Sequence, residues 1–358
     1  MKKHANIPIF IPHEGCRNEC VFCNQRTITG TCQSSDRDII PEIESALSTI
    51  DDNTEVEIAF FGGSFTGIGK DKMTRLCDDA YRFVKDGRVK SIRLSTRPDY
   101  IDAEILDILK ARGVTHIELG IQSMRQQVLD ECKRGHTTTD TEKACSLIRD
   151  YGFILGGQMM IGLPCSTAED ELYTAKRIVE MGAKEARIYP CIVFEGTELC
   201  SMAKSGKYTP LSVDDAVKRS ADVYKVFREN GVNVLRIGLQ SSEKLSSDDA
   251  VFAGANHPAM GELVMGEYYY SLILSRLGEI KKLENNTKDS RLIIYCSEKN
   301  VSKISGQNKR NKTRLLDVIK KFGFTDITIL GKAEFDDDTI TFDIQNTDEK
   351  KAEENQCT

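Results

Sequence analysis

Three cysteines near the start of the sequence are the residues best suited to chemistry. Cys16, Cys20 and Cys23 form a C-x3-C-x2-C group directly after an apolar run with strand character at residues 7–12. Three thiolates on one short loop can bind three irons of a [4Fe–4S] cluster. Without a fourth thiolate, one iron stays open to an exogenous ligand, as in catalytic metal sites. Phe22 lies between the last two cysteines and could shield the cluster from water.

Two other interpretations of the cysteine group stay open on spacing alone. A zinc site could use Cys32 or His13 as its fourth ligand, although zinc sites usually combine two separated cysteine pairs. The three thiols could also be unrelated buried side chains. Metal motifs are hypotheses until the structural context agrees, so the elements around the loop matter.

Strands and helices alternate along the first part of the chain, as expected for parallel strands joined by helical crossovers. We predict strands at residues 7–12, 56–61, 91–95, 116–121, 153–161 and 186–193, and helices at residues 36–50 (Asp36 as N-cap), 71–85, 102–112, 126–134, 139–151 and 168–181. Six strand–helix units are too few for a closed eight-stranded barrel. The predicted fold class is α/β, a partial (β/α)6 barrel or an open sheet.

Each predicted strand ends in a glycine or polar signature, such as Gly62-Gly63, Arg97-Pro98-Asp99 or Gln122-Ser123. In parallel α/β folds the carboxyl ends of the strands form one face, and that face carries the active site. The cysteine loop follows the first strand and so belongs to the same face. This context favours a catalytic interpretation of the cysteine group.

The C-terminal part has a different character. We predict a helix at residues 211–231, a strand at 232–239, a surface loop at 240–256 and a helix at 261–283. A small α+β appendage follows, with strands at 291–296, 326–330 and 339–344 and a helix at 313–322. The predicted domains are 1–240 (partial barrel), 241–286 (helical and loop extension), 287–346 (α+β appendage) and 347–358 (disordered tail).

The appendage contains a basic segment at residues 299–321, with eight Lys or Arg and one acidic residue, Asp317. Its loop resembles an RNA-binding KH loop in Gly306, although Lys309 stands where the second glycine would fall. Such a loop could bind phosphates. A solvated helix face is the alternative, because the whole chain has a net charge of −6 and no general attraction to nucleic acid.

Cysteine use and hydropathy indicate the compartment. The chain has 12 cysteines, and several of those outside the triplet lie inside helix or strand patterns, including Cys77, Cys145 and Cys191. This distribution is typical of reduced thiols. The N-terminus lacks an apolar signal core and no window approaches 18 apolar residues. We therefore expect a cytoplasmic protein without a membrane span.

The cysteine group and several further motifs together resemble a known family. The motifs are PHEGCRNECVFCNQRTITG, FFGGSFT, STRPDYID, ELGIQSM, RGHT, GLP and RIYPCIVFEGTEL. The triplet resembles the signature of the radical S-adenosylmethionine (SAM) superfamily. The set, which covers roughly residues 7–210, resembles the radical SAM domain of the Elongator catalytic subunit family. Oxygen-independent coproporphyrinogen oxidases are similar but less close.

The resemblance implies a radical SAM barrel and roles for particular residues. Cys16, Cys20 and Cys23 would bind a [4Fe–4S] cluster. The residues implied to contact S-adenosylmethionine are Gly62, Gly63 and Ser64 at its amino group, Ser95 and Gln122 at the ribose, Arg134 at the carboxylate, and Gln158 at the ribose or adenine. Arg97 would face an anion or pair with Asp99. Residues expected near the mouth are His13, Glu14, His136, Arg187, Tyr189 and Glu195, and no catalytic acid or base is assigned.

The implied function is a radical enzyme. One electron, from a donor such as flavodoxin or ferredoxin, would cleave SAM, and the resulting radical would abstract hydrogen from substrate, with an RNA (tRNA) base as the leading candidate. The sequence has no Q/R-x-x-G-x-G/A acetyl-CoA loop, so acetyl transfer is not carried over. The alternatives are a non-catalytic RNA-binding protein with a structural cluster or zinc, and a radical SAM enzyme acting on a small molecule.

Overall fold

The computed structural model describes residues 3–11, 14–16, 20–24, 36–239, 250–280 and 290–346. Contacts divide the chain into two units, Met1–Pro258 and Ala259–Thr358, and each is described by itself. His13 and Cys32, the alternative zinc ligands, and the tail at residues 347–358 lie outside the described residues. Within the described part, no helix combines the length and the hydrophobicity that crossing a bilayer requires.

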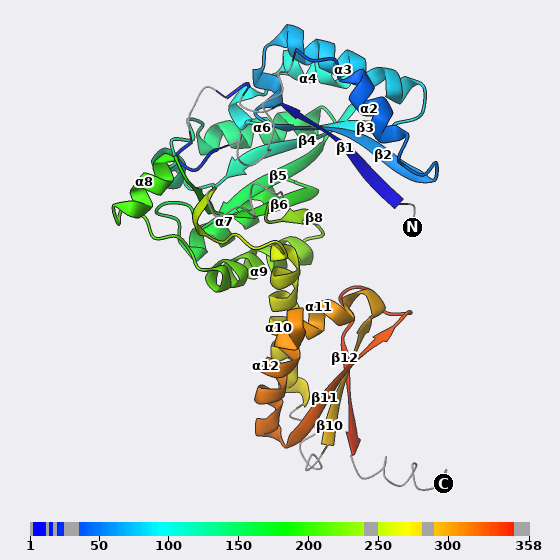
Figure 1. Cartoon of the computed structure of the whole chain (residues 1–358), viewed down its shortest axis with the longest axis vertical. Helices are drawn as coiled ribbons and strands as arrows, with labels where there is room; N and C mark the ends of the chain where they lie inside the picture. Colours follow the sequence, from blue (N-terminus) through cyan, green and yellow to red (C-terminus); the bar gives the residue numbers. More distant parts are fainter. Residues whose placement is uncertain are drawn as a thin grey trace. The chain divides into compact units, whose positions relative to one another are not determined.

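The N-terminal unit is built on one parallel sheet (Figure 1). Its strands are β1(Lys3–Ile11), β2(Thr54–Gly62), β3(Ser91–Thr96), β4(Val114–Gln122), β5(Ile154–Ile161), β6(Glu185–Pro190) and β8(Asn233–Ile237), paired in this order. Because each crossover places the next strand beside the previous one, the sheet curls into a half-barrel with helices on its outer side. The predicted α/β partial barrel is confirmed, with β8 as a seventh parallel strand.

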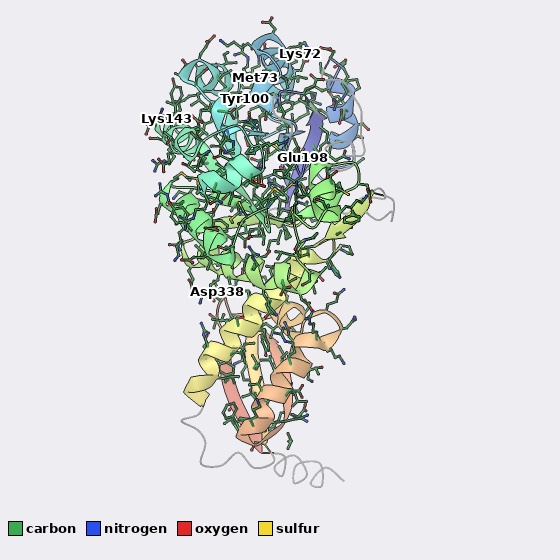
Figure 2. The ribbon with its side chains drawn as sticks, turned by 90° about the vertical axis from the view of Figure 1, so that its left-hand side faces the viewer. Lys72, Met73, Tyr100, Lys143, Glu198 and Asp338 are labelled. Carbon is green, nitrogen blue, oxygen red and sulfur yellow. The ribbon has the colours of Figure 1, made fainter. Side chains whose placement is uncertain are left out.

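The crossover helices cover the outer side of the sheet. They are α2(Ile40–Leu47), α3(Lys70–Lys85), α4(Ala103–Lys110), α5(Gln126–Glu131), α6(Thr138–Asp150), α7(Ala168–Glu180) and α9(Val213–Glu229). Two neighbours on α3, labelled in Figure 2, show the amphipathic pattern. Met73 is fully buried, whereas the ammonium of Lys72 lies 3.2 Å from a carboxylate oxygen of Asp36. Burial of one apolar stripe fixes each helix against the sheet.

Side chains alternate along the strands and give the sheet two unlike faces. Apolar residues such as Ile117 and Leu119 face the helices, and the residues between them, such as Glu118, face the concave side. Two adjacent glycines of β5 allow close packing, one on each face of the sheet. A Cβ on Gly157 would lie 2.7 Å from Ile178 of α7, and one on Gly156 would lie 2.9 Å from Cγ of Glu118. The concave face is therefore polar and closely packed.

Some elements differ from the sequence-based expectation. The strand predicted at 186–193 ends at Pro190, and the chain continues as β7(Ile192–Phe194), which pairs antiparallel with β9(Val251–Gly254) inside the predicted loop. Helix α8(Glu198–Lys204) is too short to show a clear periodic pattern. Helix α2 begins at Ile40, with Ile39 instead of Asp36 at the N-cap, because Pro41 sets the first turn.

The C-terminal unit contains α10(Met260–Ile280), β10(Ser290–Ser297), α11(Val301–Ser305), α12(Arg310–Ile319), β11(Phe324–Lys332) and β12(Thr341–Asn346). Its sheet has the order β11-β10-β12, with β10 parallel to β11 and antiparallel to β12. Helix α10 packs against α11 and α12. Contacts thus group α10 with this unit, whereas the sequence-based partition put residues 241–286 in an extension of their own; that partition stays a prediction.

Short 3-10 segments complete both units. They are η1(Phe65–Gly67) and η2(Pro98–Tyr100) after β2 and β3, and η4(Glu298–Asn300), η5(Gln307–Lys309) and η6(Lys320–Phe322) in the C-terminal unit. The first two matter for the site, because they turn the chain away from the carboxyl ends of β2 and β3.

Candidate active site

The start of the cysteine loop interlocks with the turn after β2. The Gly63 N–H donates to the Ile11 carbonyl at 2.8 Å, and the Ser64 N–H donates to the Glu14 carbonyl at 3.2 Å. A Cβ on Gly63 would lie 2.1 Å from the Glu14 carbonyl oxygen, so only glycine allows this approach. The contact brings Cys16 Sγ to 3.3 Å from Ser64 Oγ. Gly62, with φ 111°, forms the turn itself.

The other end of the cysteine loop is held from two sides. The Val21 N–H donates to the Cys132 carbonyl at 3.2 Å, and the Leu199 N–H donates to the Val21 carbonyl at 2.8 Å. Val21 belongs to an apolar cluster with Val128, Cys132, Leu163, Cys191, Val193, Leu199, Cys200 and Tyr208, and Phe22 packs against it. Residues 191–200, which follow β6, thus anchor the cysteine loop. Cys20 is buried and Cys23 is exposed.

Arg134 connects the cysteine loop to β4. It lies between α5 and α6 and is only 7% exposed. Its Nη1 donates to Cys20 Sγ at 3.3 Å, and its Nη2 donates to the Gly120 carbonyl at 2.7 Å. A Cβ at position 120 would lie 2.7 Å from Nη2, which explains the glycine. Arg134 is therefore a buried residue of the site and not a solvated residue at a helix end.

Four residues carry buried polar atoms without a hydrogen bond, one directly after β3, one at the end of β4 and two between α5 and α6. We call Arg97, Gln122, Arg134 and His136 the rim residues. The atoms are Arg97 Nη1, Gln122 Oε1, Arg134 Nε and both ring nitrogens of His136. Gln122 also has a left-handed φ of 66°, at an irregularity in the pairing of β4 with β5. Buried polar atoms normally have partners, so these atoms fit a polar ligand with acceptor and donor groups.

Two rim residues show how charge is arranged at this edge. Arg97 is 1% exposed and donates through Nε and Nη2 to Asp99, each at 2.9 Å. The predicted pair with Asp99 therefore exists and still leaves Nη1 available. Burial, followed by the charges of Arg134 and Arg97, lowers the pKa of His136 to about 3. His136 is thus a neutral imidazole at physiological pH.

Ser95 and Gln158 are brought together on the concave face. Gln158 Nε2 donates to Ser95 Oγ and to a carboxylate oxygen of Glu118, each at 3.0 Å. Glu118 also accepts from Nε and Nη2 of Arg187. Sequence reasoning missed Glu118. Two features of the sequence could have indicated it. Glu118 is a single charged residue in an otherwise apolar strand, and the alternation of side chains puts it on the same face of the sheet as Ser95 and Gln158.

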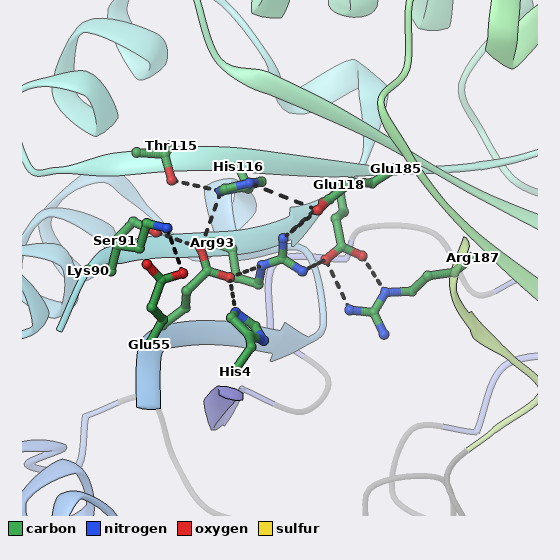
Figure 3. Close-up of polar contacts among 11 residues, drawn as sticks. His4, Glu55, Lys90, Ser91, Arg93, Thr115, His116, Glu118, Glu185 and Arg187 are labelled. Atoms are coloured by element: carbon green, nitrogen blue, oxygen red, sulfur yellow. Dashed lines mark hydrogen bonds and ion pairs between the residues drawn. The ribbon is translucent and has the colours of Figure 1, made fainter. Parts of the chain in front are cut away.

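The contacts of Glu118 belong to a larger concave-face network, and Figure 3 shows the part of it around Arg93 and Glu118. Its members are His4, Glu57, Ser91, Arg93, Ser95, His116, Glu118, Gln158, Glu185 and Arg187. Arg93 is ion paired to Glu57, Glu118 and Glu185 at 3.2, 3.4 and 2.8 Å. Burial raises the pKa of Glu57, but the Ser91 hydroxyl and the charge of Arg93 outweigh it and hold that pKa below its usual value.

Other residues expected near the mouth lie in ordinary surroundings. Glu14 has a carboxylate oxygen 3.6 Å from Lys72 Nζ. Glu195 is half-buried and ion paired with Lys204 at 2.8 Å. Burial raises the pKa of Tyr189, which keeps the phenol protonated.

The thiols of the cysteine loop are the donor type that an iron–sulfur cluster requires. Among the described residues, no group of three or more His, Cys, Asp or Glu side chains surrounds one ion position. A [4Fe–4S] cluster instead takes one thiolate per iron, and the three thiols of one short loop are such a set. The rim atoms without partners are suited to the carboxylate and hydroxyl groups of S-adenosylmethionine. The residues present therefore fit both groups.

Comparisons with known proteins address the family of the chain. The Radical SAM superfamily matches residues 10–178, and the Radical_SAM C-terminal domain matches residues 183–269. The tRNA uridine(34) acetyltransferase of Methanocaldococcus jannaschii is 32% identical over 184 residues, which are 46% of this chain and 34% of the relative. Elongator complex protein 3 of Schizosaccharomyces pombe is 27% identical over 203 residues, 50% of this chain and 37% of the relative.

A solved structure of similar fold is the archaeal Methanocaldococcus infernus Elp3 with an N-terminal deletion. It aligns with a TM-score of 0.59 and 22% identity, over 76% of this chain and 68% of that one, and supports the fold alone. The chain spans about a third of the length of the two sequence relatives. The two matched regions together cover most of the chain. The protein therefore belongs to the radical SAM superfamily, whose enzymes use a [4Fe–4S] cluster and S-adenosylmethionine, and its radical SAM region is homologous to that of Elongator complex protein 3 and the tRNA uridine(34) acetyltransferases.

Proposed function

We propose that this enzyme abstracts hydrogen from an RNA base, with a tRNA uridine as the leading candidate. The observation that carries the substrate class is the similarity of its radical SAM region to proteins named tRNA uridine(34) acetyltransferase. The chain spans about a third of the first of them, so acetyl transfer is outside the proposal. When bound, the cluster and SAM supply one-electron cleavage of the sulfonium and the radical chemistry that follows.

We assign the cluster to Cys16, Cys20 and Cys23. Support comes from the two anchors of their loop, one at the turn after β2 and one in the apolar cluster around Val21. A loop fixed at both ends keeps its thiolates in place before the metal arrives. Val21 and Phe22 pack on one apolar cluster, which would shield that side of the iron–sulfur cluster from water.

We assign SAM to the carboxyl ends of β2 to β5. The backbone carbonyls of Gly62, Gly63 and Ser64 would accept from its amino group. The amide nitrogen of Gln158 is engaged by Ser95 and Glu118, which leaves the amide oxygen to accept from a ribose hydroxyl. Gln122 Oε1 is a second such acceptor.

The carboxylate of SAM has two candidate donors. Arg134 was predicted for this role; its two Nη atoms bind Cys20 and the Gly120 carbonyl, and its Nε is buried without a hydrogen bond. Arg97 keeps Nη1. We propose that these two guanidinium groups share the carboxylate.

We propose a one-electron donor such as flavodoxin or ferredoxin, and a cytoplasmic location. The location is supported by the cysteines, since the ten within the described residues are all free thiols, as a reducing compartment keeps them.

The basic segment at residues 299–321 supports an RNA substrate. Several of its charges are held within the protein, such as Lys299 by Asp337 at 2.7 Å. Within the described residues, Lys309 and Lys312 take part in no ion pair, and Lys309 is exposed. Gly306 and Lys309 have φ of 74° and 61°, so both positions of the KH-like loop are left-handed. The loop leads into the N-terminus of α12, which favours phosphate.

The substrate class is tested by mass spectrometry of tRNA and rRNA nucleosides from cells with and without the gene. A modified nucleoside that disappears with the gene supports the proposal. Identical nucleoside profiles, with SAM cleavage intact in the purified enzyme, would favour a small-molecule substrate instead.

Binding gives a second test. Changing Lys309 and Lys312 to Ala should weaken tRNA retention and lower the slope of affinity against salt by about one for each lysine. The matched control changes Lys143 and Lys176 to Ala, two exposed lysines on α6 and α7 (Lys143 is labelled in Figure 2). Equal losses in both pairs would show that only net charge matters.

Anaerobic reconstitution separates the enzyme from a non-catalytic binding protein. We expect about four irons per chain and reductive cleavage of SAM. Tight zinc binding without SAM cleavage would favour the structural alternative.

A further inference from the structure

Arg134 carries a positive charge that no carboxylate of the described residues neutralises. Its side chain is 7% exposed, and within the described residues no carboxylate lies at ion-pair distance from it. A guanidinium stays protonated in proteins, and a buried charge without a counter-charge is costly. The group that faces it is the sulfur of Cys20, 3.3 Å from Nη1.

The other arginine near Cys20 differs in this respect. Arg97 is also buried, but two hydrogen bonds to Asp99 neutralise it locally. Its remaining field at Cys20 is therefore weaker than that of Arg134. The neutral imidazole of His136 adds no charge.

The three cysteines consequently have unequal surroundings. Cys20 is buried and faces a guanidinium, Cys16 lies 3.3 Å from the neutral hydroxyl of Ser64, and Cys23 is exposed to solvent. The thiolate is the form that binds metal, and an N–H donor with a full positive charge stabilises a thiolate more strongly than a hydroxyl does.

We propose that Arg134 is a positioning residue that sets the reduction potential of the cluster through Cys20, in addition to any contact with SAM. Hydrogen bonds to ligand sulfurs, net charge and solvent exposure set the potentials of iron–sulfur clusters. Reduction adds one negative charge to the cluster, and the uncompensated guanidinium favours the state with that charge. Arg134 therefore raises the potential and makes the cluster easier to reduce by a physiological donor.

The second bond of Arg134 explains why an arginine is needed. Nη2 holds the Gly120 carbonyl at 2.7 Å while Nη1 holds Cys20. A planar fork can serve both acceptors at once, whereas a lysine presents one ammonium and cannot hold this geometry. The potential thus depends on the position of the guanidinium as well as its charge.

The test is the midpoint potential of the reconstituted cluster, measured by EPR-monitored redox titration without substrate. In Arg134→Met the ratio of reduced to oxidised cluster at a fixed potential should fall at least tenfold, which is about 59 mV for a one-electron couple. Arg134→Lys should fall between this variant and the wild type. Ser64→Ala, which removes the neutral hydroxyl near Cys16, should shift less than either.

Arg177→Met is the matched control, because it removes the same charge from an arginine of α7 that is ion paired with Glu142 and Glu180. An equal shift in this control, or an unchanged potential in Arg134→Lys and Arg134→Met, would overturn the proposal. If Arg134→Met fails to hold four irons, Arg134→Lys and Ser64→Ala still decide. The inference rests on the cluster alone, so it stands or fails independently of the RNA substrate.

Discussion

The concave-face network and the rim residues are both polar and mostly buried or half-buried, but their polar contacts differ. In the network, each nitrogen of the Arg93 guanidinium lies within 3.4 Å of a carboxylate oxygen, and Glu118 is shared between Arg93, Arg187 and Gln158. Arg93 Nε has no hydrogen bond but lies 3.2 Å from a Glu57 carboxylate oxygen, whereas at the rim Arg97, Gln122, Arg134 and His136 retain buried atoms with neither a hydrogen bond nor an ion pair among the described residues. Arg97 and Gln122 lie at the ends of the strands that carry Arg93 and Glu118, whereas Arg134 and His136 lie between α5 and α6.

The contrast distinguishes polar side chains that stabilise the fold from polar side chains that are available to bind a ligand. A network whose charges are paired stabilises one arrangement of strands and leaves few groups for a ligand, such as the amide oxygen of Gln158. An incomplete one costs stability in the free protein and regains it when a ligand supplies the missing partners. Perturbing the network should therefore change stability first, and perturbing the rim should change cofactor binding first.

The largest effect is expected from the cluster ligands. Replacing Cys16, Cys20 and Cys23 together by Ala should abolish iron binding and SAM cleavage, because no other thiol replaces three ligands of one loop. Secondary structure by circular dichroism should stay unchanged, since the sheet does not depend on these thiols. Iron content is the primary measurement. Four irons retained in the triple variant would show that the ligands lie elsewhere.

The next largest effect concerns the network. Glu118→Ala removes the carboxylate between Arg93 and Arg187 and should lower the free energy of unfolding by about 3–5 kcal/mol, as for other broken buried ion pairs. Urea unfolding of the apoprotein measures it. The double variant Glu118→Leu with Arg187→Leu is the control and should recover much of the loss, because it leaves no unpaired Arg187. If Glu118→Ala lowers the free energy of unfolding by less than about 1 kcal/mol, the ion pairs of the network contribute no more than exposed salt bridges do.

Features that depend on local sequence could be predicted, and features that depend on the packing of distant segments could not. The strand rhythm predicted the half-barrel, because alternating apolar runs and helical stripes depend on local sequence. The cysteine loop and the Gly62-Gly63 turn were recognised from motifs. Glu118 was missed because its role depends on Gln158 and Arg187, which join it only through strand register.

Longer-range packing also limited the prediction of particular residues. That Arg134 contacts Cys20 and Gly120 depends on the turn between α5 and α6 and on the anchored cysteine loop, which are far apart in sequence. The burial of His136 depends on the same packing. The division of β6 from β7 follows from the antiparallel partner β9, some 60 residues away, which no local pattern reveals.

A matched pair of glutamines sharpens the comparison at a smaller scale. Gln122→Gly removes a side chain with a free buried oxygen and relieves a left-handed φ, so apoprotein stability should stay level or rise by about 1 kcal/mol. SAM affinity should fall about tenfold, near the 1.4 kcal/mol of one lost hydrogen bond. Gln158→Ala should instead reduce apoprotein stability, because Ser95 and Glu118 lose their partner. Isothermal titration and urea unfolding give both quantities, and equal behaviour of the two variants would remove the distinction.

The smallest expected effect is the pH dependence due to His136. Burial and the neighbouring arginines lower its pKa from 6.5 to about 3, so between these values the unfolded chain binds a proton that the folded chain does not. Stability from this group is therefore lost as the pH falls below 6.5, at up to about 1.4 kcal/mol per pH unit. Urea unfolding of the wild type and His136→Gln between about pH 4.5 and 7 isolates the contribution, since carboxylates titrate in both proteins. The difference between the two curves should shrink on acidification. Parallel curves would show that His136 is already protonated or has a partner, and the rim would then be less incomplete than its geometry indicates.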